Sequence, residues 1–161
     1  MHSRIFEISS QPIEAESRLT EYAVPEWFCG SIADYVDTVR EEEREDDMNW
    51  LVGRFGGNCE RVGDKLEFKE MTQEDYFRFD YIKFQESLTV LQACDLESFS
   101  GKRYLPSLHE AMYKVKSAYE DRFGFYVYDR DCEELMTLDN WVRNMNVSVP
   151  SYIGGIVDYH F

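Results

Sequence analysis

The stretch from Thr72 to about Ala93 constrains the fold most, because it carries the clearest helical pattern in the chain. Thr72 is a helix-capping residue type, and Asp75 follows it at the spacing of a capping box. Large apolar residues then recur at steps of three and four, which places them along one face of a helix. This stripe consists of Phe77, Tyr81, Phe84, Leu88 and Leu91.

Three further apolar residues, Tyr76, Phe79 and Ile82, widen this face beyond the two-position seam of a coiled coil. A helix with so broad an apolar surface is expected inside a globule. We therefore predict a core helix that serves as a scaffold and carries no chemistry of its own.

Shorter elements are predicted on both sides of this helix from apolar periodicity and turn residues. Strands are expected at residues 3–8, 59–62, 65–70, 125–129 and 151–161, and a long ordered loop at residues 11–30. Helices are expected at residues 31–45, at 48–55, at 107–124 from a capping box of Ser107 and Glu110, and after a Thr137 cap. Because helices and strands do not alternate regularly, we predict a single α+β domain over residues 1–161, with a mixed or antiparallel sheet of about five strands and helices packed on it.

Two glycine sites predict how the strands pair. Gly63-Asp64 is a two-residue turn signal that would pair Arg61 with Leu66, unless a bulge shifts the register. In the last strand, Gly154-Gly155 predicts a bulge or the close approach of another backbone. The apolar residues around it indicate a strand paired inside the sheet. The alternative is an edge that adds a strand from a partner or from a second copy, which would give a homodimer.

The charge of the chain is strongly acidic and uneven. It has 17 basic and 32 acidic residues, a formal net charge of −15, and residues 1–80 hold 9 of the basic and 20 of the acidic residues. Because 43% of the residues are hydrophobic, the acid lies on a folded body rather than on a disordered chain. Such a charge disfavours direct binding to nucleic acid or anionic membrane and favours a basic partner.

The acidic run at residues 41–47 is the most conspicuous candidate for function. If residues 31–45 are helical, carboxylates recur along one side at steps of three and four. Their spacing would be comparable with that of phosphates along a nucleic-acid strand, so a DNA-binding protein could accept this surface in place of DNA. The alternative is an ordinary solvated helix face. The candidate partner-binding residues are Asp34, Asp37, Glu41, Glu42, Glu45 and Asp46.

No catalytic or metal motif is complete in the sequence. The four cysteines lie far apart without a CxxC pair and are expected to be free, buried thiols. Asp129, Asp131 and Glu133 begin like a calcium loop, but the glycine turn and the bidentate glutamate are missing, so a polar turn is predicted. His109-Glu110 begins like a zinc-protease helix, but Tyr113 stands at the position of the second histidine.

The sequence therefore predicts no catalytic residue, no metal and no cofactor. An enzyme with a site assembled from scattered residues is the alternative, because missing motifs exclude only the families that carry them. The N-terminal residues lack a signal-like apolar run, and no stretch has the roughly 20 apolar residues of a membrane span. A cytoplasmic protein is expected.

The opening RIFEIS, the long aromatic helix after a hairpin, the segment SAYEDRFGFYV and the ending YIGGIVDYHF together resemble an uncharacterised group of small acidic proteins of gut Gram-positive bacteria, some carried on mobile elements. The resemblance covers nearly the whole chain, but no activity is attached to that group, so it implies no site residues. In size and acidity alone, the chain is also similar to antirestriction proteins that mimic DNA. We therefore predict a small acidic interaction protein with a basic or DNA-binding partner. The most specific form of this prediction is that the acidic surface mimics DNA.

Overall fold

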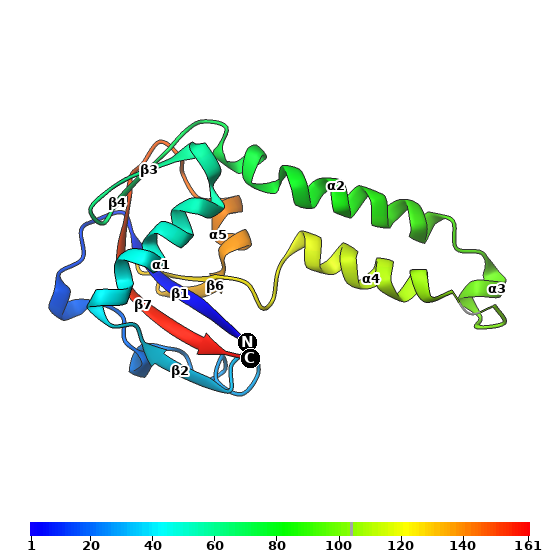
Figure 1. Cartoon of the computed structure of the whole chain (residues 1–161), viewed down its shortest axis with the longest axis horizontal. Coiled ribbons are helices and arrows are strands. Elements are labelled where there is room, and N and C mark those ends of the chain that lie inside the picture. Colours follow the sequence, from blue (N-terminus) through cyan, green and yellow to red (C-terminus); the bar gives the residue numbers. More distant parts are fainter. Residues whose placement is uncertain (104) are drawn as a thin grey trace. The chain divides into compact units, whose positions relative to one another are not determined.

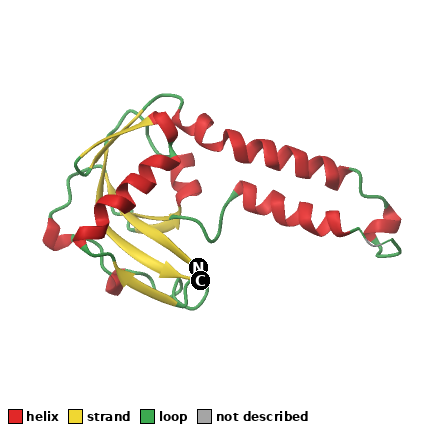
Figure 2. Cartoon of the chain, viewed as in Figure 1, coloured by secondary structure: helices red, strands yellow, loops and turns green. Residues whose placement is uncertain are grey.

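A computed structural model describes residues 1–103 and 105–161 and shows an α+β chain made of two compact units (Figure 1). The unit of residues 1–76 and 122–161 contains all the described strands and is called the sheet unit below. The unit of residues 77–121 is helical and is called the helical unit. Figure 2 colours helices and strands differently: the sheet unit contains both, whereas the helical unit contains helices and no strand among the described residues.

The described residues form seven strands and five α-helices. The strands are β1 (His2–Ser9), β2 (Tyr35–Thr38), β3 (Cys59–Val62), β4 (Lys65–Phe68), β5 (Tyr126–Asp129), β6 (Glu134–Thr137) and β7 (Ser151–His160). The helices are α1 (Glu41–Arg54), α2 (Thr72–Gln92), α3 (Leu96–Phe99), α4 (Pro106–Tyr119) and α5 (Leu138–Asn144). The predicted fold class is confirmed, with more strands than expected.

The described strands join into one mixed sheet with β7 and β1 at its centre. Its order is β3-β4-β7-β1-β5-β6, and β2 also pairs with β7. β1 and β5 run parallel, whereas β1 and β7 run antiparallel. β7 has β1 along one side, and it has β4 and then β2 along the other. The last strand is therefore paired inside the sheet as predicted, and the alternative of a free edge there is wrong.

Both predicted glycine sites shape the sheet. The hairpin pairs Arg61 with Leu66 and Val62 with Lys65 without a bulge, so Val62 is 79% exposed. In the centre, the register between β1 and β7 shifts between Phe6 and Ile8, opposite Gly154-Gly155. The bulge predicted in β7 is therefore present.

One face of the sheet is covered by the loop that precedes β2. This loop is ordered by two 3-10 turns, Ala15–Ser17 and Glu21–Ala23, as expected for residues 11–30. It contributes apolar side chains to a buried cluster with residues of β1, β5, β6 and β7. The members of the cluster are Ile5, Leu19, Val24, Phe28, Ala33, Tyr126, Leu135, Val157 and Tyr159.

α1 packs on the opposite face. Side chains alternate along a strand, so Phe6 points away from the cluster that contains Ile5. The Phe6 ring centroid lies 5.3 Å from that of Phe125, and Phe125 lies 4.4 Å from Trp50 of α1. The sheet is thus covered on both faces, which explains why most residues of β1 and β7 are buried whichever face they point to.

α2 spans nearly the predicted residues, but its apolar stripe does not form a core. Tyr81 is 60% exposed, and the remaining stripe residues are only half-buried. Only the first turn of α2 belongs to the sheet unit, where the hydroxyl of Thr72 donates to the carbonyls of Asn58 and Lys69. Most of the helix therefore lies outside the main core. The half-buried stripe residues are Phe77, Phe84, Leu88 and Leu91.

The prediction of a helix at residues 31–45 is wrong. Residues 35–38 form β2, in which Val36 pairs with Tyr159, and α1 begins at Glu41 and continues through the separate helix predicted at 48–55. The spacing of the apolar residues at 32, 36 and 39 is compatible with a helix. In the structure, however, residue 36 belongs to a strand, and its side chain is partly buried because this strand pairs with β7. Tertiary pairing has overridden a weak helical pattern.

Two other predicted helix starts have different outcomes. Thr137 accepts a hydrogen bond from the Asn140 amide at 3.2 Å and caps α5 as predicted. The capping box predicted for α4 is absent, because the helix begins at Pro106 with Leu105 before it and no side-chain cap. Proline suits a first turn, since its missing amide hydrogen has no intrahelical partner there.

The cysteines are free in the structure, but only Cys59 is fully buried. Cys29 and Cys132 are exposed, and Cys94 is intermediate, so the expectation of four buried thiols is wrong. Cys59 is buried because its side chain lies on the inner face of the β3–β4 hairpin, where it pairs with Phe68. Burial, followed by the charge of Glu60, raises the pKa of the Cys59 thiol to about 11.

This pKa predicts a loss of stability at high pH. The pKa of Cys59 in the folded chain lies above the ordinary value of 9.0. The protonated thiol therefore makes its full contribution to the free energy of unfolding below about pH 9, and this contribution is lost as the pH rises through about 11. Between about pH 8 and pH 11, the free energy of unfolding should fall by roughly 2 kcal/mol more in the unmodified chain than in Cys59→Ala. Urea unfolding of both proteins at the two pH values measures this difference. Equal losses in the two proteins would contradict it.

Candidate functional site

The six acidic residues proposed from the sequence lie on two different elements. Asp37 is on β2 and Asp34 directly precedes that strand, whereas the other four lie on the first two turns of α1. The predicted ladder along one helix is therefore not formed, because residues 35–38 are extended. The candidate site therefore has two parts: the acidic residues at the start of α1, and Asp34 and Asp37 at β2 beside β7.

The first two turns of α1 present a group of exposed carboxylates, which we call the acidic patch. Negative charge at this end of a helix is stabilised by the helix dipole. Two of these carboxylates pair with arginines of the chain: Glu41 with Arg18 at 2.9 Å, and Glu45 with Arg61. The acidic patch consists of Glu41, Glu42, Glu43, Glu45 and Asp46.

The other three members of the patch, Glu42, Glu43 and Asp46, are exposed and make no ion pair in the described part of the chain. Their charge is therefore not neutralised locally. These three carboxylates also fit the alternative of an ordinary solvated helix face, whereas Glu41 and Glu45 are each held by an arginine. The patch combines fixed and free carboxylates on one short helical segment.

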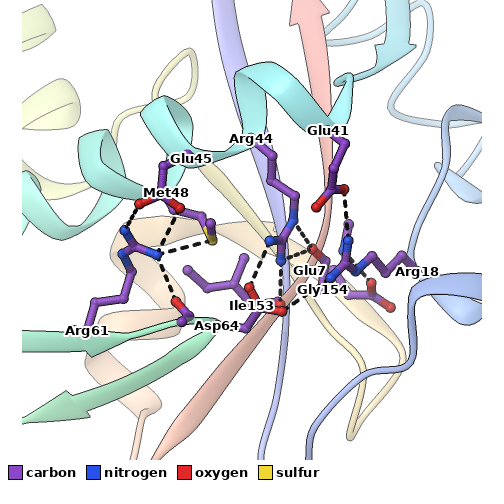
Figure 3. Close-up of polar contacts among 12 residues, drawn as sticks. Glu7, Arg18, Glu41, Arg44, Glu45, Met48, Arg61, Asp64, Ile153 and Gly154 are labelled. Atoms are coloured by element: carbon purple, nitrogen blue, oxygen red, sulfur yellow. Dashed lines mark hydrogen bonds and ion pairs between the residues drawn. The ribbon is translucent and has the colours of Figure 1, made fainter.

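Arg44 anchors this segment to the centre of the sheet (Figure 3). Its side chain is buried although it stands within a run of acids. Nε and Nη2 donate to the carbonyl of Gly154, Nη2 also donates to the carbonyl of Ile153, and Nη1 lies 2.8 Å from Oδ1 of Asp64. The β7 bulge supplies these carbonyls, so the bulge is the point to which α1 is fixed.

Glu7 holds the bulge from the other side. It is 2% exposed, and its Oε2 accepts hydrogen bonds from the amides of Leu19 and Gly155, both at 2.7 Å. Its Oε1 accepts from Nη1 of Arg130 at 2.8 Å. A buried carboxylate with these partners is fully hydrogen-bonded, as burial of a charge requires. Glu7 therefore joins the loop over the sheet to β7.

Asp64 connects the loop to the anchor of α1. Its carboxylate receives Arg44 on one oxygen and Nη2 of Arg18 on the other, at 3.2 Å. Arg18 also reaches Glu41 at the start of α1. The network thus links the hairpin turn, the loop and the acidic helix, as the dashed contacts in Figure 3 show.

A second polar group lies at the edge of the sheet where β1 and β2 begin and β7 ends. Nδ1 of His2 lies 2.8 Å from Asp158, and Nδ1 of His160 lies 2.8 Å from Asp34. Asp37 stands directly opposite Asp158 in the strand pairing. Its charge is also the main cause that raises the pKa of Tyr35. Asp34 is therefore paired with a histidine, unlike the free carboxylates of α1.

The described residues contain neither a metal-binding cluster nor a membrane-spanning helix. Within residues 1–103 and 105–161, no group of three or more His, Cys, Asp or Glu side chains is arranged to hold a metal ion. No helix in the same residues combines the length and apolar character of a membrane span. Comparisons with protein-family models, with curated proteins and with solved structures found no match to this chain.

Sequence reasoning missed the two residues that hold the site together. Arg44 is the one cation within the acidic run EEEREDD, and Glu7 is the one charge inside the apolar stretch IFEI. A charged residue alone in a segment of opposite character is a signal for a buried, paired group. Neither pattern reveals the partners, because these are backbone groups of β7 and of the loop together with Asp64 and Arg130, all distant in sequence.

Proposed function

We propose that this chain is an acidic interaction protein that presents the first two turns of α1 to a basic partner. The observation that carries the proposal is the acidic patch, in which Glu42, Glu43 and Asp46 are exposed and unpaired within the described chain. Carboxylates that the chain does not neutralise are available to arginines and lysines of another protein, and charge complementarity of this kind steers association.

The fixed position of the helix supports the proposal. Arg44 ties the patch to the central strand through the carbonyls of Ile153 and Gly154, so the carboxylates are held by a rigid scaffold. A preorganised charged surface binds with a smaller entropic cost than a mobile one. The binding surface therefore does not have to be ordered by the partner.

The distribution of charge supports it as well. The sheet unit has 11 basic and 25 acidic residues, whereas the helical unit has six and seven. Nearly all the excess negative charge thus lies in the unit that carries the acidic patch. Such a field raises the rate at which a basic partner arrives, in a manner that salt weakens.

In its sharpest form, the proposal is that the partner is a DNA-binding protein and that the carboxylates take the place of phosphates. This version rests on α1, because Asp34 and Asp37 lie beside β7 and do not extend a helical row. Backbone phosphates are the main sites at which proteins bind DNA without reading its sequence. A partner that recognises phosphates through arginine and lysine would accept carboxylates on a fixed helix.

Neutralising the free carboxylates tests the proposal. The variant Glu42→Gln, Glu43→Gln, Asp46→Asn should reduce capture of basic proteins from a bacterial lysate by roughly tenfold at low salt, because three free charges are lost. The matched control replaces three exposed acids of the loop, Glu14, Glu16 and Glu26, by glutamine and changes the net charge equally. The control should capture as well as the unmodified chain.

The outcome with duplex DNA separates the two versions. Displacement of the captured protein by duplex DNA supports mimicry, whereas a captured basic protein that DNA does not displace limits the proposal to an acidic interaction surface. Equal capture by both triple variants would show that net charge alone decides binding, and the site on α1 would be wrong. The enzyme alternative stays a prediction without a specific observation in its favour.

A further inference from the structure

The helical unit buries very little of its apolar surface. Among its described residues, only the small side chains of Ser87, Ser98 and Ala111 are buried. A single pair of helices covers one side of each helix at most, and bundles close a core only when more helices are added. The large apolar side chains left exposed in this unit are Phe79, Tyr81, Ile82, Val90, Leu96, Phe99, Met112, Tyr113 and Tyr119.

One face of α2 carries several of these residues together. Phe79, Ile82 and Val90 are 67%, 49% and 40% exposed. With Lys83 and Glu86, both also exposed, they follow one another at steps that return to the same side of a helix. This face lies opposite the half-buried stripe that begins at Phe77. α2 therefore has two apolar sides, and its second side is open in a single chain.

The open face of α2 is complementary to itself in an antiparallel arrangement. If two copies of α2 cross with a two-fold axis between positions 84 and 85, Phe79 of one copy meets Val90 of the other. The same axis places Lys83 against Glu86. Two-fold symmetry repeats each contact, so one register gives two apolar contacts and two ion pairs.

The charges around this face favour a second copy over repulsion. The helical unit is nearly neutral, with six basic and seven acidic residues, whereas the strongly acidic sheet unit would repel its own copy. Lys83 pairs with Asp80 at 3.1 Å within its own helix and lies 4.3 Å from the Phe79 ring centroid. Glu86 makes no ion pair in the described residues, so its carboxylate is available to Lys83 of a second chain.

We propose that a second copy of this chain docks antiparallel on the open face of α2, with Phe79 against Val90 and Lys83 against Glu86. The contact extends over about 17 Å of helix, since residues 79–90 rise about 1.5 Å each. It completes the apolar packing of the helical unit. A dimer of this kind also carries two acidic patches, so it would bind a repetitive or dimeric partner with higher avidity.

Charge exchange across the two-fold axis tests the register. Lys83→Glu places two carboxylates against each other across the axis, and Glu86→Lys places two ammonium groups there, so each variant alone should weaken dimerisation roughly tenfold or more. An equimolar mixture of the two variants should form a heterodimer, because one chain then carries two carboxylates at positions 83 and 86, the other carries two ammonium groups, and both facing pairs are oppositely charged. The double variant Lys83→Glu, Glu86→Lys should dimerise like the unmodified chain. Sedimentation velocity over a concentration series measures all four samples.

The mixture also separates dimer contacts from effects inside one helix. Loss of the Lys83–Asp80 pair occurs in the Lys83→Glu variant whether or not it is mixed, so only an intermolecular contact is restored by mixing. The apolar contact is tested by Phe79→Ala, which should weaken the dimer, with Tyr113→Ala on α4 as an equally exposed aromatic control. Circular dichroism confirms that each variant remains folded.

A chain that stays monomeric at concentrations on the order of 100 μM would overturn the proposal. So would a dimer that neither single charge variant weakens, and this result would favour pairing through a strand edge instead. The capture assay for the acidic patch is independent of this outcome, because α1 and the open face of α2 share no residue.

Discussion

Replacing Arg44 by methionine is expected to cost about 3 kcal/mol of folding free energy and to release α1 from the sheet. Methionine keeps the apolar volume of the buried stem but leaves the carbonyls of Ile153 and Gly154 and one oxygen of Asp64 without their donor. Buried groups that lose a charged partner carry a desolvation cost of this size. For a chain of this length, the midpoint of thermal unfolding should fall by roughly 6–12 °C.

Arg40→Met is the matched control for this variant. Arg40 directly precedes α1 and is exposed, so its loss should change stability by less than about 0.5 kcal/mol. Hydrogen exchange distinguishes a local from a global effect: in Arg44→Met, amides of α1 should lose protection before those of β1 and β7. A variant as stable as the control would show that Arg44 does not anchor the helix. Capture of a basic partner should also weaken in Arg44→Met, because the acidic patch is no longer held in place.

Replacing Gly155 by alanine is expected to destabilise the sheet unit by about 3 kcal/mol or more. The added Cβ would clash with the carbonyl of Leu19 and would lie 2.7 Å from its amide nitrogen. The backbone of Leu19 cannot move away cheaply, because its amide is bound to buried Glu7, which also binds the amide of Gly155. Overpacking against backbone is costly for this reason.

Gly53→Ala provides a control of opposite sign. Gly53 lies inside α1, and an added Cβ there would meet no atom within 4 Å. The change should therefore be neutral or should stabilise the chain by up to about 1 kcal/mol, because alanine favours a helix over glycine. Urea unfolding compares both variants with the unmodified chain. If Gly155→Ala unfolded at the same urea concentration as Gly53→Ala, this result would contradict the close packing of the Leu19 backbone against Gly155 of β7.

Local patterns predicted a large part of the fold. The first strand, the hairpin pairing of Arg61 with Leu66, the helix from Thr72 and the cap at Thr137 are present as expected. These features depend on residues within one or two turns of each other, where propensity and periodicity decide. The strand at Glu134–Thr137 was not predicted, because it has only two apolar residues and directly follows a polar turn; its pairing with β5 makes it a strand.

The candidate site was predicted only in part. The exposed carboxylates at residues 41–46 follow from the acidic run, and the structure places them on one helix. Asp34 and Asp37 were expected on the same helix, but the pairing of β2 with β7 places them on a strand or directly before it. A contact between residues more than a hundred positions apart decided this, and no local pattern contains it.

The sequence by itself determined the excess of acid, the α+β class, the glycine bulge in the last strand and the apolar stripe of α2. Only the tertiary structure decided which of these features lie inside. It placed Arg44 and Glu7 in the interior, because the bulge at Gly154-Gly155 offers carbonyls and an amide that satisfy buried charges. It also left most of α2 without a core, because periodicity shows that a face is apolar and burial requires a partner that only folding or association supplies.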